Sequence, residues 1–141
     1  MAETTYIDIA RAKTKPTVAV SDSYKKWGRP VVNQGCFLIP AMLLTAQKEL
    51  GLTATQLTVL LHLCELCQLE TLKSNPAIKT IAARLGLTPR QVQRHFTKLE
   101  DAGFIERIER YGARGAQKPN IYDLSGLAGK LKALEMKFRE I

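Results

Sequence analysis

Residues 78–104 constrain this chain more than any other stretch, because they hold two helical patterns separated by a single glycine. In the first pattern, IKTIAARL, apolar side chains recur at helical spacing as far as Leu85. Gly86 follows directly, and glycine readily adopts the left-handed backbone in which many helices end. The stretch therefore predicts two short helices joined by a tight turn.

The second helix has a well-defined start. Thr88 suits the N-cap position, Pro89 the first helical position, and Gln91 stands three residues after the cap, as in a capping box. Gly103 ends the pattern. The apolar side chains of this helix fall on one stripe, formed by Val92, Phe96 and Leu99.

Polar and basic side chains occupy the opposite face of this second helix. At 100° per residue the groups nearly opposite the stripe, or flanking that position, are Arg90, Gln91, Gln93, Arg94, Thr97 and Lys98. Arginine can bond guanine through two hydrogen bonds, glutamine can do the same with adenine, and threonine and lysine reach phosphates or bases. This face predicts the recognition helix of a helix-turn-helix; the alternative is an ordinary solvated amphipathic helix.

A hairpin is predicted directly after this helix. Two short candidate strands, 104–110 and 120–124, flank a loop that contains two glycines together with Arg114 and Lys118. Glycines and basic residues between two strands suit a wing whose tip touches backbone phosphates.

The segments ARLGLTPRQVQRHFTKLEDAGFIERIER and NIYDLSGL resemble the winged helix-turn-helix proteins of bacteria, phages and plasmids. The resemblance implies a mainly α fold with a small β-hairpin wing (α+β) and an appended C-terminal helix. It also implies that the second helix enters the major groove of double-stranded DNA while the wing follows the backbone. The DNA-binding set would then be Thr88, Arg90, Gln91, Gln93, Arg94, Thr97, Lys98, Arg114 and Lys118.

Three functions fit this resemblance. The first is a sequence-specific DNA-binding protein acting as a transcriptional regulator, and the second is the origin-binding module of a plasmid or phage replication initiator. The third is a winged helix used for protein–protein contact, which the basic face of the second helix disfavours.

The distribution of charge supports an anionic partner. The chain carries a net charge of +8, and nucleic acid is the commonest partner of so basic a protein. Residues 76–118 hold nine lysines and arginines against four acidic residues, whereas residues 41–72 hold one against three. No apolar run approaches the ~20 residues of a membrane helix, and no signal-peptide core is visible, so we expect a cytoplasmic protein without a membrane partner.

The rest of the chain is predicted to form an arm, a helical core and a last helix. Residues 1–30 are expected to be a basic, flexible arm, 31–124 the winged domain, and 125–141 a separate helix. Within the domain, Gly35–Ile39 could add a third strand to the wing, and Pro40 could start a helix through Leu50. Thr53 and Asn75 are the expected caps of the next two helices.

The last helix, capped by Ser125, carries a narrow apolar seam. Its members repeat at intervals of four, three and four: Leu127, Leu131, Leu134 and Phe138. Such a seam predicts a homodimer, or alternatively packing of the helix on its own domain.

The sequence offers no catalytic or metal site. Cys64 and Cys67 form a C-x-x-C pair, but they fall inside an apolar helix, where reduced buried thiols are expected. There is no phosphate-binding glycine loop and no nucleophile beside a base. We therefore expect a protein that is not an enzyme and has no cofactor.

Overall fold

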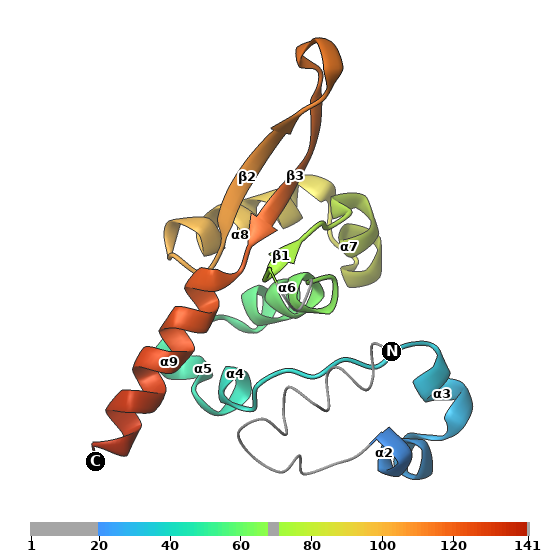
Figure 1. Cartoon of the computed structure of the whole chain (residues 1–141), viewed down its shortest axis with the longest axis vertical. Helices are drawn as coiled ribbons and strands as arrows, with labels where there is room; N and C mark the ends of the chain where they lie inside the picture. Colours follow the sequence, from blue (N-terminus) through green and yellow to red (C-terminus); the bar gives the residue numbers. More distant parts are fainter. Residues whose placement is uncertain (1–19, 68–70, 141) are drawn as a thin grey trace. The chain divides into compact units, whose positions relative to one another are not determined.

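The computed structural model describes residues 20–67 and 71–140, apart from the side chains of residues 20, 21 and 117–119 (Figure 1). The chain divides into two compact units, Met1–Pro40 and Ala41–Ile141. The sequence predicts a boundary at residue 30 instead, and that boundary stays a prediction. Residues 1–19 of the predicted arm lie outside the described residues, but the remainder of the arm is helical. It contains α2 (Val20–Trp27), and α3 (Arg29–Asn33) follows after Gly28, whose φ is 90°.

The second unit begins with three helices, α4 (Met42–Thr45), α5 (Gln47–Leu50) and α6 (Ala54–Glu65). The predicted single helix from Pro40 to Leu50 is wrong, because the backbone leaves the helical region at Ala46, with φ −111° and ψ 21°.

Helix α6 is the central core element, as its apolar character predicts. Thr53 caps it through the expected capping box with Gln56, in which the two reciprocal hydrogen bonds measure 3.0 and 3.1 Å. The buried side chains of α6 are Leu57, Val59, Leu60 and Leu63.

The helix-turn-helix consists of α7 (Ile78–Leu85) and α8 (Pro89–Asp101). Gly86 between them has the left-handed φ of 68° that the sequence predicts. The cap predicted at Asn75 is wrong: Ala77 holds the N-cap position of α7, and no side chain caps the helix.

The sheet has three antiparallel strands, and the two strands of its hairpin follow α8 in the chain (Figure 1). The hairpin strands β2 (Glu106–Tyr111) and β3 (Gln117–Asp123) pair along their length, and β1 (Lys73–Ser74) pairs with the other edge of β3. The third strand predicted at Gly35–Ile39 is wrong, because those residues form no strand. Strand β1 instead lies directly before α7 in the chain, which ties the hairpin to the helix-turn-helix.

Helix α9 (Ser125–Arg139) continues from β3. The predicted Ser125 cap is wrong, since Ser125 is already the first helical residue. The carboxylate of Asp123 accepts a hydrogen bond from the Ser125 backbone N–H at 2.8 Å and thereby satisfies one free donor of the first turn. The backbone N–H of Leu127 donates to the Phe104 carbonyl at 3.0 Å, which holds the start of α9 against the end of α8. The fold is the α+β winged helix-turn-helix with an appended C-terminal helix that the sequence predicts.

Candidate nucleic-acid interface

The buried stripe of α8 determines which of its faces meets solvent. Val92 is fully buried, and Phe96 and Leu99 are 3% and 1% exposed, so the helix cannot rotate without breaking the core. The helix start is equally fixed: Thr88 and Gln91 form the predicted capping box, with hydrogen bonds of 2.8 and 3.1 Å. All members of the predicted DNA-binding set on α8 and at its N-cap are exposed, namely Thr88, Arg90, Gln91, Gln93, Arg94, Thr97 and Lys98.

Three cations, Arg90, Arg94 and Lys98, are exposed on this face. Within the part of the chain that the structure describes, none of Arg90, Arg94 and Lys98 takes part in an ion pair. Cations gathered on one helix face repel each other, and an approaching polyanion removes that repulsion.

Two members of the predicted set already have structural roles. The Gln91 side-chain oxygen accepts the Thr88 backbone N–H, so Gln91 can offer only its amide hydrogens to a base. The Thr97 hydroxyl donates to the Gln93 backbone carbonyl at 3.1 Å, which leaves its oxygen as an acceptor. Neither the side-chain oxygen nor the side-chain nitrogen of Gln93 takes part in a hydrogen bond among the described residues. Gln93 is therefore better suited than Gln91 to the two-bond recognition of adenine.

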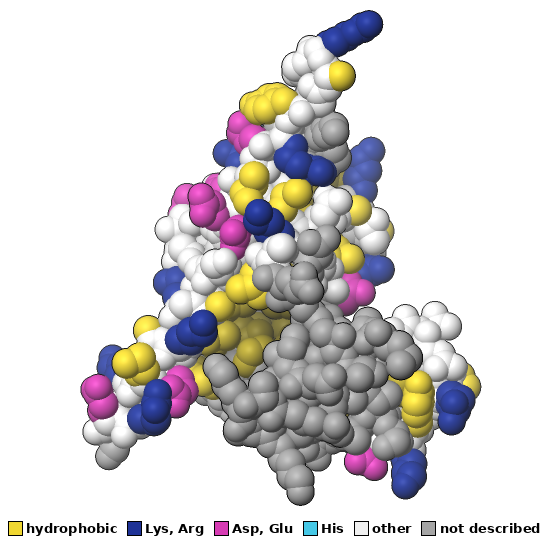
Figure 2. All heavy atoms as spheres, viewed as in Figure 1, with side chains coloured by type: hydrophobic (Ala, Val, Ile, Leu, Met, Phe, Trp, Pro, Cys, Tyr) yellow, Lys and Arg dark blue, Asp and Glu magenta, His cyan; other side chains and the backbone are white. Residues whose placement is uncertain are grey.

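The hairpin ends in a short 3-10 turn, η1 (Ala113–Gly115), with Arg114 at its centre. Arg114 is exposed and has a left-handed backbone, with φ 63° and ψ 22°. Figure 2 shows basic side chains along the hairpin and at its tip. The backbone of Lys118 pairs with Arg110 across the hairpin, but its predicted phosphate contact lies outside the described residues, because its side chain is not described.

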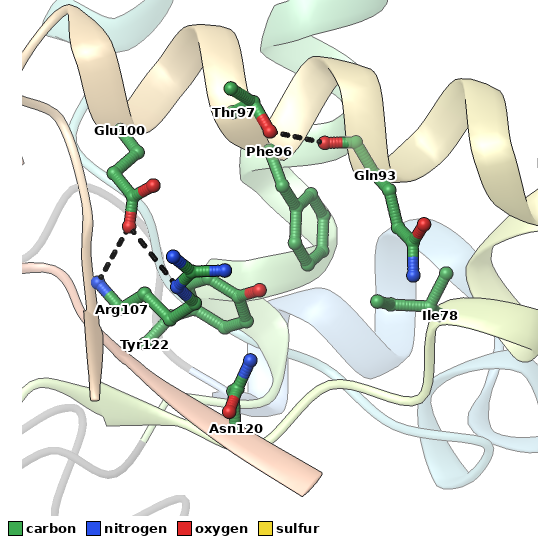
Figure 3. A pocket seen from close by; sticks show the side chains of 8 residues that line it. All are labelled: Ile78, Gln93, Phe96, Thr97, Glu100, Arg107, Asn120 and Tyr122. Atoms are coloured by element: carbon green, nitrogen blue, oxygen red, sulfur yellow. Dashed lines mark hydrogen bonds and ion pairs between the residues drawn. The ribbon is translucent and has the colours of Figure 1, made fainter. Parts of the chain in front are cut away.

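A pocket of about 250 Å³ lies between α8 and the hairpin (Figure 3). Its walls are formed by Ile78, Gln93, Phe96, Thr97, Glu100, Arg107, Asn120 and Tyr122. Sequence reasoning missed the three hairpin residues in this set, because their side of the sheet depends on strand register.

Polar contacts hold the walls of this pocket in place. The Glu100 carboxylate accepts the Arg107 backbone N–H at 3.2 Å, and its oxygen lies 3.7 Å from Nε of the Arg107 side chain. The rings of Phe96 and Tyr122 meet edge to face, with centroids 4.9 Å apart. Burial raises the pKa of Tyr122, although a hydrogen bond with Asn120 acts in the opposite direction.

The two halves of the predicted dimerisation seam on α9 differ in burial. Leu127 and Leu131 are 5% and 9% exposed, so the chain itself already buries them. Leu134 is half-buried and Phe138 is 43% exposed. Only the second half of the seam is thus available to another molecule.

The described residues hold no group of three or more histidine, cysteine or acidic side chains that could bind a metal ion. Burial and the neighbouring Cys67 raise the pKa of the Cys64 thiol to about 11. His62 Nδ1 lies 2.9 Å from the Thr58 carbonyl oxygen, within the helix. Across the described ranges, no helix has both the length and the apolar character needed to span a bilayer.

Residues 50–105 match the family model described as a helix-turn-helix domain. Among solved structures, a "possible transcriptional regulator from Methanosarcina mazei Go1" is similar at 18% identity and a TM-score of 0.39, covering 67% of this chain and 83% of that one. A search of curated proteins found no match. The matched residues include α6, α7 and α8, so these three helices are similar to a helix-turn-helix domain.

Proposed function

We propose that this winged helix-turn-helix protein is a sequence-specific double-stranded DNA-binding protein, without catalytic activity, that regulates transcription. Helix α8 would enter the major groove, where Arg90, Gln93 and Arg94 read base edges. Arg114 at the hairpin tip would hold the backbone of the same duplex.

The proposal rests on the exposed cationic face of α8, whose Arg90, Arg94 and Lys98 take part in no ion pair among the described residues. A side chain can discriminate between bases only if its helix keeps one orientation relative to the groove. The buried stripe fixes the rotation of α8, and the capping box fixes its start. At its C-terminal end, the Glu100 carboxylate accepts the Arg107 backbone N–H, and the Phe104 carbonyl accepts the Leu127 backbone N–H of α9. The exposed cations are therefore presented in a defined pattern.

Selection of bound sequences from a random duplex pool tests the proposal. The full chain should enrich one short motif, and a chain with Arg90, Arg94 and Lys98 all changed to alanine should enrich none. A matched variant with Lys48, Lys132 and Lys137 changed to alanine loses the same charge from other exposed positions and should enrich the wild-type motif. If the two triple variants behave alike, net charge and not α8 determines binding. If the wild-type chain enriches nothing, sequence-specific recognition is excluded.

A further inference from the structure

The pocket between α8 and the hairpin is the feature that DNA binding leaves unexplained. A duplex contacts exposed surface, whereas this pocket is a concave site that reaches inward to Phe96 and Tyr122, which are 3% and 7% exposed (Figure 3). Concave sites with an apolar floor and a few converging polar groups commonly bind small molecules.

The lining groups determine which ligand fits. The single cation and the single carboxylate of the lining, Arg107 and Glu100, lie beside each other and cancel in charge. A ligand with a net charge would therefore lose its hydration without gaining a counterion of its own. The remaining polar walls are two carboxamides, a hydroxyl and a phenol: Gln93, Asn120, Thr97 and Tyr122.

Asn120 adds an independent observation. Its side-chain oxygen is buried and has no hydrogen-bond partner within the described part of the chain. Buried amide oxygens are rarely left without a donor, because the lost hydrogen bond with water is not replaced. In Figure 3 the carboxamide lies across from Gln93 and Ile78 with its nitrogen toward the pocket and its oxygen away from it, so a rotation of the amide would turn the oxygen toward a ligand.

We propose that this pocket binds a small, net-uncharged molecule rich in hydrogen-bonding groups, and that its occupation regulates DNA binding. A volume of about 250 Å³ equals that of about eight water molecules in the liquid, which sets the size of the ligand. The regulatory part rests on the proposed function, since Gln93 and Thr97 belong both to the pocket and to the predicted DNA-binding set. A ligand that engages the Gln93 carboxamide withdraws it from the base edge.

Nicotinamide is a suitable probe, because it joins a flat ring to a carboxamide and carries no net charge. Nicotinate, which differs by a carboxylate in place of that carboxamide, and inorganic phosphate are the matched anionic probes. All three would be titrated into the full ¹⁵N-labelled chain at constant ionic strength, with the side-chain amide signals of Asn120 and Gln93 as reporters. Nicotinamide should shift both signals saturably and bind at least tenfold more tightly than either anion.

Two variants locate the site. Asn120→Leu keeps the shape of the side chain while removing its amide, and should weaken nicotinamide binding at least tenfold. Asn75→Leu makes the same chemical change at an exposed position outside the pocket and should leave binding within twofold of wild type. Circular dichroism melts check that both variants fold; should Asn120→Leu fail to fold, Thr97→Val takes its place at the opposite wall.

The regulatory step is measured on the duplex motif selected above. Saturating nicotinamide should lower the affinity of the wild-type chain at least threefold and leave that of Asn120→Leu unchanged. If phosphate or the duplex itself produces the Asn120 shifts while nicotinamide does not, the pocket is part of the DNA interface and the proposal is wrong. Absence of shifts with every probe overturns it as well. If the chain binds no duplex, the proposed function and the regulatory step both fail, while the titration alone still decides whether the pocket takes the ligand.

Discussion

The backbone of Gly126, in the first turn of α9, lies against the carbonyl group of Gly103 at the end of α8. A Cβ atom added to Gly126 would overlap the Gly103 oxygen and come within 3.3 Å of the Phe104 oxygen. Gly129, one turn later in the same helix, has no other group within 4 Å of the corresponding position. This close approach lets the Leu127 N–H reach the Phe104 carbonyl and holds α9 against the winged domain.

The two glycines should therefore respond oppositely to alanine. Gly129→Ala should raise the free energy of unfolding by up to about 1 kcal/mol, because alanine is the better helix former. Gly126→Ala gains the same propensity but must displace backbone, and we expect a net loss of about 1–3 kcal/mol. Urea unfolding followed by circular dichroism measures both. Stabilisation by both variants would show that the end of α8 and the start of α9 are not in close contact.

Changes in the helix and in the wing should affect DNA binding differently. Arg94→Ala should cost about 1–3 kcal/mol on the selected duplex and relax preference at one base position. Arg114→Ala should weaken selected and random duplexes by similar factors, because phosphate contacts carry no sequence information. Fluorescence anisotropy with both duplexes measures this. If Arg94→Ala lowered the affinity for both duplexes equally, Arg94 of α8 would not discriminate between bases.

Salt should weaken binding in proportion to the phosphates that the cations neutralise. Log affinity should fall linearly with log salt, with a slope on the order of −0.9 per phosphate. Each α8 cation that neutralises a phosphate should account for about 0.9 of that slope, so replacement of Arg90, Arg94 and Lys98 by alanine should make the slope shallower by at most roughly 2 to 3. The triple variant of Lys48, Lys132 and Lys137 should keep the wild-type slope. A slope that does not depend on the first three residues would place the phosphate contacts elsewhere.

The divided seam of α9 gives a test of the proposed homodimer. Leu131→Lys places a charge at a buried position and should lower the melting temperature strongly, whatever the oligomeric state. Phe138→Lys, at an exposed position, should leave the melting temperature within a few degrees but convert a dimer into a monomer. Light scattering gives the molar mass of each variant. A wild-type chain that is monomeric at tens of micromolar concentration would exclude the dimer.

The thiols should differ in reactivity. With a pKa of about 11, Cys64 is almost entirely protonated at pH 8, and the thiolate is the reactive form. Iodoacetamide at pH 8 should therefore alkylate the exposed Cys36 well before Cys64, and labelling of Cys64 should accelerate as the pH rises toward 11. Peptide mass spectrometry resolves the order. Labelling of Cys64 as fast as that of Cys36 at pH 8 would mean that the pKa of the half-buried Cys64 thiol is not raised.

Features set by neighbouring residues were predictable from the sequence. Thr88 and Gln91 define the start of α8 through local hydrogen bonds, and Gly86 ends α7 through its own backbone preference. The predicted caps of α7 and α9 were wrong, and the reason is again local. Ala77 enters α7 with no side-chain cap, and at α9 the capping carboxylate comes from Asp123, two residues before the predicted Ser125.

Features that depend on pairing between distant segments were not predictable. Strand β1 is two residues long, which is too short to show any periodicity, and only its pairing with Tyr122 and Asp123 makes it a strand. The pocket depends on which side of the hairpin Arg107 and Asn120 occupy. That arrangement follows from the register of β2 against β3, including the irregularity between Ile108 and Arg110.

At the hairpin tip, the backbone conformation of Arg114 lowers folding stability, while its side chain is proposed to contact a phosphate. A left-handed φ of 63° costs arginine conformational energy that glycine would not incur. Arg114→Gly should therefore make the isolated protein harder to unfold and, if the tip holds a phosphate, make the complex easier to dissociate. At the hairpin tip, a substitution that raises folding stability would then lower the affinity for DNA.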